Sequence, residues 1–94
     1  MRAVAFMLLA SAVSNPTRLR VLFQLGAGPL TIGELASSVG VTQAAVSRHV
    51  QRMEEAGLVA AERRGRCTIV RRRERQWSIV ESVLASSGWE EVTR

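Results

Sequence analysis

Two short segments joined at Gly40 constrain the fold of this chain more than any other part of its sequence. The first follows Thr31, a residue type that caps helices, and Glu34 three residues later completes a capping box. The second follows Thr42, another capping residue, and ends at Gly57, because glycine adopts the left-handed conformation at little cost. These signals predict two short helices separated by a turn.

The spacing of small and apolar residues within 31–56 is that of a helix-turn-helix. With residue 32 counted as the first, Leu35 and Ala36 take positions four and five, where the helices approach closely, and Gly40 takes position nine in the turn. Positions ten and fifteen, in the shared core, hold Val41 and Val46. In such a motif the second helix lies in the major groove of DNA.

The second helix of this motif has two faces of different character. Its apolar face, expected to hold the helix to the domain, consists of Val46, Val50 and Met53. Its exposed face consists of Gln43, Ala44, Ser47, Arg48, Gln51 and Arg52. The alternative is that these are ordinary solvated polar residues on the outside of a helix.

The chemistry of the exposed side chains matches parts of DNA. Gln43 suits adenine, Arg48 suits guanine, and Ala44 suits a thymine methyl group. Thr42 and Arg52 are better placed for phosphates. We therefore expect both base and backbone contacts from this helix.

His49 occupies position eighteen of the same pattern, which is half turned toward the core. It is the only histidine, and no second ligand stands near it in the sequence, so it does not indicate a metal site. We expect it to pack at the edge of the helix with a ring nitrogen that reaches a phosphate. Base reading is left to Gln43, Ser47 and Arg48.

From Leu58 onward the hydropathy period changes, and "LVAAERRGRCTIVRR" predicts a hairpin within 57–73 that turns around Gly65. All thirteen basic residues of the chain are arginine, and the formal net charge is +5. Arginine suits bidentate contacts to phosphate or guanine, although codon bias in a GC-rich genome also explains the missing lysine. The arginines expected to contact DNA at the turn are Arg63, Arg64 and Arg66.

The run from Arg71 to Arg75 has two interpretations. It extends the positive field of the hairpin along the DNA backbone, where neutralised phosphates release counterions. Alternatively, it is the solvated start of the last helix.

A single cysteine, Cys67, excludes an internal disulfide and favours a reducing compartment, so we expect a cytoplasmic protein. Cys67 lies beside Arg66, whose charge favours a redox-sensitive thiolate. The alternative is a small residue that fills a strand position.

Apolar helices are predicted at both ends of the chain. Residues 1–14 resemble a signal peptide, but the favoured interpretation is a helix that is buried between two subunits, and the apolar run is too short to span a bilayer. Asn15 and Pro16 begin the next helix, which ends at Gly26 and Gly28. The last helix, over 74–88, has an apolar stripe formed by Trp77, Ile79, Val80, Val83 and Leu84.

The stretches "NPTRLRVL", "IGELASSVGVTQAAVSRHVQRMEEAGLV" and "RRGR" together resemble the ArsR/SmtB family of bacterial winged-helix repressors, over about residues 5–85. The resemblance implies a mainly α fold with a small β-hairpin, in the order α-α-α-α-β-β-α, as one domain over 1–94. It also implies a homodimer that pairs through the first and last helices. Such a dimer reads a palindromic operator in double-stranded DNA with the fourth helix, while the hairpin, or wing, contacts flanking DNA.

This chain departs from the metal-sensing members of that family. Thr31, Ile32, Gly33 and Glu34 stand where those members have a Cys-x-Cys-Asp segment, so no thiolate site forms there. The second family site falls near Glu74, Gln76, Ser87 and Glu90, and two carboxylates without an imidazole bind transition metals poorly. We expect neither a metal nor another cofactor.

The sequence lacks the parts of an enzyme, with one histidine, no aspartate, no tyrosine and no glycine-rich phosphate loop. A sequence-specific DNA-binding repressor is the leading hypothesis. The second is a winged-helix module that binds another protein, because the fold alone does not decide the function. Whether a small molecule or a protein acts as effector stays open.

Overall fold

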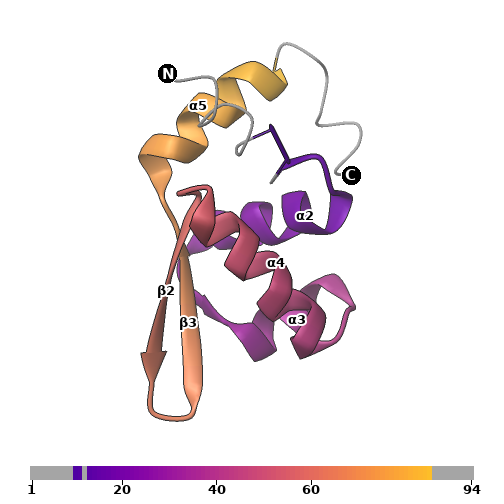
Figure 1. Ribbon diagram of the computed structural model, residues 1–94, viewed down its shortest axis with the longest axis vertical. Helices are drawn as coiled ribbons and strands as arrows, with labels where there is room; N and C mark the ends of the chain where they lie inside the picture. The colour runs from indigo at the N-terminus through magenta and orange to yellow at the C-terminus, as the bar shows by residue number, and fades with distance from the viewer. Residues whose placement is uncertain (1–9, 12, 86–94) are drawn as a thin grey trace.

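A computed structural model describes residues 10, 11 and 13–85 of the chain (Figure 1). The predicted fold, mainly helical with a small β-hairpin, is confirmed. In chain order the elements are α2 (Pro16–Gln24), a 3-10 turn η1 (Leu25–Ala27), β1 (Leu30–Thr31), α3 (Ile32–Val39), α4 (Gln43–Glu55), β2 (Val59–Arg64), β3 (Cys67–Arg72) and α5 (Glu74–Ala85). Of the helix predicted over 1–14, only residues 10, 11 and 13 are described as helical; residues 86–88 of the predicted last helix also lie outside the described part.

The helix-turn-helix begins and turns at the predicted residues. The Thr31 hydroxyl accepts from the Glu34 amide at 3.1 Å, and the Glu34 carboxylate accepts from the Thr31 amide at 2.9 Å, which forms the capping box. Gly40 ends α3 with a φ of 73°, a left-handed value that favours glycine. The Thr42 hydroxyl then caps α4 by accepting from the Ala45 amide at 3.1 Å.

One core lies where α2, α3, α4, α5 and the hairpin meet. Its largest fully buried side chains are Leu22, Leu35, Met53, Leu58, Val21, Val46, Val59 and Val70. Trp77 of α5 joins the same cluster and is 3% exposed. Burial of each large apolar side chain contributes about 1.5–3 kcal/mol, so the core fixes the direction in which the outer face of α4 points.

The sheet has a third strand that the sequence did not indicate. The strand order is β1-β3-β2, and β1 pairs antiparallel with β3 through Leu30 opposite Val70 and Thr31 opposite Ile69. A strand of two residues has no alternation of its own, so it forms only because β3 offers backbone partners. The predicted hairpin is confirmed as β2 and β3, and β1 adds a short third strand that was not predicted.

The apolar stripe predicted on the last helix is divided between two surroundings. Trp77 and Val80 are buried against the core of the same chain. Ile79 and Val83 are 45% and 56% exposed on α5, and Phe23 of α2 is 50% exposed. The sequence pattern did not distinguish these two sets, because both fit helical spacing.

Candidate nucleic-acid interface

The two faces of α4 are separated as the sequence predicts. Val46, Val50 and Met53 are buried, at 0%, 4% and 0% exposure. Exposed residues at the cap and on the opposite face are Thr42, Gln43, Ala44, Ser47, Arg48, Gln51 and Arg52. A polar outer face on a helix whose inner face is locked in the core can approach a large partner without disturbing the fold.

A hollow of about 290 Å³ joins the beginning of α3, one flank of α4 and the end of the hairpin. Gln43 and Ser47 line it from α4, and Arg63 and Arg66 line it from the hairpin. The structure therefore brings predicted residues of α4 close to predicted residues of the hairpin, although these two groups are at least sixteen positions apart in the sequence.

The three arginines at the hairpin turn do not share one face. Gly65 makes the turn with a φ of 60°, and its carbonyl accepts from Nε of Arg63 at 3.0 Å. Neighbouring residues of a strand point to opposite faces, so Arg64 points away from the hollow that Arg63 lines. There Arg64 forms an exposed ion pair with Glu62 at 3.5 Å.

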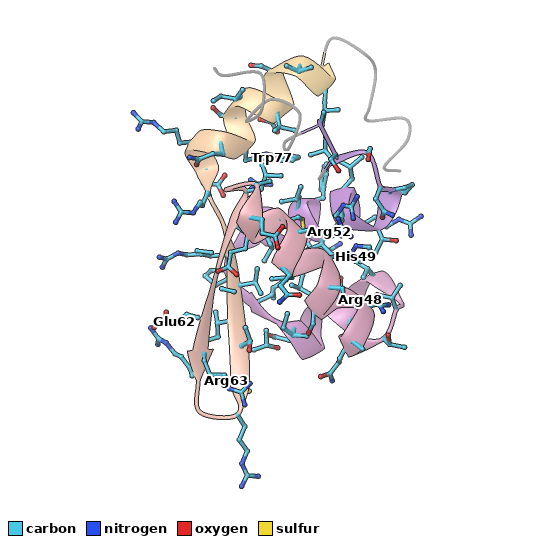
Figure 2. All side chains as sticks on the ribbon, in the orientation of Figure 1. Arg48, His49, Arg52, Glu62, Arg63 and Trp77 are labelled. Atoms are coloured by element: carbon cyan, nitrogen blue, oxygen red, sulfur yellow. The ribbon has the colours of Figure 1, made fainter. Side chains whose placement is uncertain are left out.

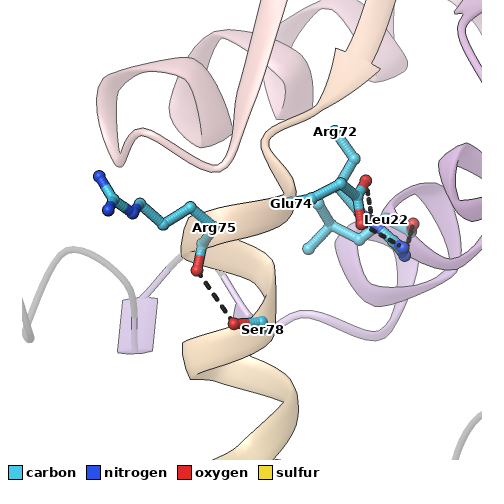
Figure 3. A network of polar contacts seen from close by, with 5 residues as sticks. All are labelled: Leu22, Arg72, Glu74, Arg75 and Ser78. Carbon is cyan, nitrogen blue, oxygen red and sulfur yellow. Dashed lines mark hydrogen bonds and ion pairs between the residues drawn. The ribbon is translucent and has the colours of Figure 1, made fainter.

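At the other end of the hairpin, the side chain of Arg72 is largely buried and connects the hairpin to α2 and α5 by polar contacts (Figure 3). Its side chain is 12% exposed, its Nη1 donates to the Leu22 carbonyl at 3.0 Å, and its Nη2 pairs with Glu74 at 2.8 Å. Its guanidinium also lies over the Trp77 ring. Neither interpretation of the run from Arg71 to Arg75 anticipated this role for Arg72, although its neighbours Arg71 and Arg73 are exposed.

A carboxylate connects α4 directly to the hairpin. Oε2 of Glu54 accepts a hydrogen bond from the backbone amide of Ala61 in β2 at 3.2 Å. Because β2 is an edge strand, this amide would otherwise be open to other partners. No local pattern in the sequence indicates this contact.

His49 lies on the other flank of α4, along the side turned away from the hairpin, together with Arg48 and Arg52 (Figure 2). Its Nδ1 is 3.4 Å from Nη1 of Arg18 in α2, and Nη2 of Arg18 donates to the Ser11 carbonyl at 2.9 Å. Burial, and then the charges of Arg18, Arg48 and Arg52, lower the pKa of His49 below its ordinary value. Arg18 was not among the residues expected in the interface.

The residues considered for redox or metal chemistry do not form a common site in the described part of the chain. Cys67 is a free, exposed cysteine, and it is among the residues at the hollow beside α4. Thr31 and Glu34 form the capping box, and Glu74 is paired with Arg72; Ser87 and Glu90 lie outside the described residues. Over residues 10, 11 and 13–85, the structure has no group of three or more histidine, cysteine, aspartate or glutamate side chains that could hold a metal ion. None of the helices described has the length and apolar character needed to cross a membrane.

Known proteins are similar to this chain in sequence and in fold. A profile of the helix-turn-helix domain family matches residues 13–61. The HTH-type transcriptional regulator NmtR of Mycobacterium tuberculosis is 40% identical over 58 residues, which are 62% of this chain and 48% of NmtR. The chain thus spans about half the length of this relative.

Two solved structures illustrate the similarity in three dimensions. The transcriptional repressor BigR from Xylella fastidiosa matches with a TM-score of 0.75 and 26% identity, over 90% of this chain and 87% of BigR. The homodimeric winged helix-turn-helix domain of a possible ArsR-family regulator from Mycobacterium bovis matches in fold, with a TM-score of 0.76 and 24% identity over 92% of this chain and 83% of that domain. The chain therefore belongs to the helix-turn-helix domain family, and it has the winged helix-turn-helix fold of these structures.

Proposed function

We propose that the protein is a transcriptional regulator that binds DNA sequence-specifically and acts as a homodimeric repressor in the cytoplasm. The observation that supports this most strongly is the hollow in which the outer flank of α4 meets Arg63 and Arg66 of the hairpin. A helix with polar side chains beside a cationic ribbon complements a major groove and the phosphate backbone that borders it.

The side chains of α4 and the hairpin divide into two chemical groups. Gln43, Ala44, Ser47 and Arg48 read base edges in the major groove, by hydrogen bonds or by contact with a thymine methyl. The contacts to phosphates come from Thr42, His49, Arg52, Arg63 and Arg66. Because Arg64 points to the other face of the hairpin, we assign it to flanking backbone and not to the groove that α4 enters.

The dimer would form through the helices at 1–14 and 74–88, within one domain over 1–94. Exposed Ile79 and Val83 on α5 support this arrangement, because large apolar side chains at the surface often mark an interface. Two-fold symmetry then places the two copies of α4 in successive major grooves, roughly 34 Å apart. The operator is expected to be palindromic for the same reason.

Selection of duplexes from a random-sequence pool tests this proposal. We expect enrichment of an inverted repeat, with affinity in the nanomolar range or tighter and a steep decrease as salt rises. If no sequence is enriched and the weak binding depends on salt alone, specific recognition is excluded. A winged-helix module that binds another protein would then be the better description.

A further inference from the structure

A contact between α2 and α4 determines the state of the single histidine. Nη1 of Arg18 lies 3.4 Å from Nδ1 of His49, at the long end of hydrogen-bonding distance. The two residues are 31 positions apart, so this contact exists only because the helices pack together. The guanidinium is also held on its other side, where Nη2 donates to the Ser11 carbonyl.

The chemistry of the pair allows one arrangement of protons at neutral pH. A guanidinium stays protonated in proteins and has only donors, so Nδ1 of His49 must be the acceptor. In a neutral imidazole the other nitrogen, Nε2, then bears the proton. The two ring nitrogens diverge, so the Nε2 proton points away from Arg18 and α2.

The surrounding charges favour this neutral form. Burial lowers the pKa of His49, and the charges of Arg18 on α2 and of Arg48 and Arg52 on α4 lower it further. A second proton on the ring would also place two donors opposite each other at Nδ1. His49 is therefore held as a neutral donor through Nε2, beside two exposed arginines.

We propose that Arg18 is a positioning residue for DNA binding: it fixes His49 as the Nε2-protonated tautomer and turns that N–H toward a backbone phosphate on the flank of α4 away from the hairpin. The inference rests on the proposed function, because the phosphate belongs to the operator. The interface would then include α2. The DNA backbone would be contacted on both flanks of α4, by the hairpin arginines on one side and by His49 and Arg52 on the other. Anchors on both flanks fix the rotation of a helix in the groove.

The tautomer is measured directly by ¹⁵N NMR, because the protein has one imidazole. At pH 7.5 the parent should show a protonated Nε2 and an unprotonated Nδ1. Arg18→Gln should give a mixture of tautomers, since an amide both donates and accepts, whereas Arg18→Lys should retain the parent tautomer. A parent spectrum with protonated Nδ1 overturns the proposal without any variant.

The DNA measurement uses a duplex that the parent protein selects from a random-sequence pool. Arg20→Gln is the matched control, because Arg20 is an exposed arginine on the same helix and the charge change is identical. Arg18→Gln should weaken binding about 3- to 10-fold more than Arg20→Gln does, the effect of one hydrogen bond of ordinary strength. In a His49→Ala background the two changes should weaken binding equally, because Arg18 acts through the ring.

Three outcomes decide between this inference and the proposed function. If the parent selects a specific duplex but Arg18→Gln and Arg20→Gln weaken it equally, the positioning role is wrong and DNA recognition stands. If the parent selects no sequence, both fail. An additional loss from Arg18→Gln that persists in the His49→Ala background also overturns the role, because it would show that Arg18 acts without His49.

Discussion

The guanidinium of Arg72 lies over the ring of Trp77, with 4.7 Å between the Cζ atom and the ring centroid. The same guanidinium donates to the Leu22 carbonyl, so the base of the hairpin is tied to both α2 and α5. In a small domain such a tie matters, because the apolar core alone contributes little stability in excess of the conformational entropy. The base of the hairpin is therefore held to α2 and α5 by an arginine far from the hollow.

Arg72→Ala should lower the free energy of unfolding by about 2–4 kcal/mol. The loss combines a charged hydrogen bond to the Leu22 carbonyl and the cation–π contact with Trp77, whereas the ion pair with exposed Glu74 adds little. Urea denaturation measures it. Arg71→Ala, at an exposed neighbouring position, is the control and should change stability by no more than about 0.5 kcal/mol. Equal effects from the two variants would contradict the role assigned to Arg72.

Local signals predicted the caps and turns, because their chemistry lies within a few residues. Asn15, Thr31 and Thr42 cap the helices that the sequence indicated, and Gly40 and Gly57 have the expected positive φ values. The faces of α4 also followed from helical periodicity alone. The residues proposed for the interface therefore lie on α4 and the hairpin, the elements that the sequence predicts for them.

Contacts between distant segments were not predictable in the same way. Arg72 and Leu22 are 50 positions apart, and an arginine at the end of a cationic run gives no sign that it is enclosed. The contact of Arg18 with His49 likewise depends on how α2 packs against α4. β1 was missed because its two residues become a strand only by pairing with β3.

Thr31→Ala should destabilise the protein by about 1–2 kcal/mol, because it removes the side chain that caps α3. Thr31→Ser retains the hydroxyl and should remain within a few tenths of a kcal/mol of the parent, about the spread between good capping residues. Thermal denaturation of both variants measures these changes in stability. A loss of stability in Thr31→Ser as large as in Thr31→Ala would indicate that the methyl group, and not the cap, is responsible.

Glu54→Ala should loosen the hairpin edge without unfolding the domain. The Ala61 amide loses its carboxylate acceptor, so its hydrogen exchange should accelerate. Residue-resolved exchange by NMR measures this, and Glu55→Ala provides a control with the same charge change at an exposed neighbouring position. Unchanged exchange at Ala61 in Glu54→Ala would remove the proposed connection between α4 and β2.

The stability of the protein should decrease as the pH falls from above 6.5, the ordinary pKa of histidine, through the lowered pKa of folded His49. In this range the unfolded chain binds more protons than the folded protein, so stability rises with pH. Urea denaturation of the parent and His49→Gln at pH 7.5 and 5.5 isolates the effect, since no other histidine is present. Parallel pH dependence in the two proteins would show that His49 is not responsible.

If the outer face of α4 reads the bases of a DNA operator, the base preferences of the protein must change in Arg48→Ala. Binding is measured to a set of duplexes in which each position of the selected site is changed in turn. Arg48→Ala should lower the binding free energy by about 1–3 kcal/mol and should lose the preference for one base pair in each half-site. Arg63→Ala should weaken the binding of all duplexes uniformly. An Arg48→Ala protein with the affinity and the base preferences of the parent would contradict the claim.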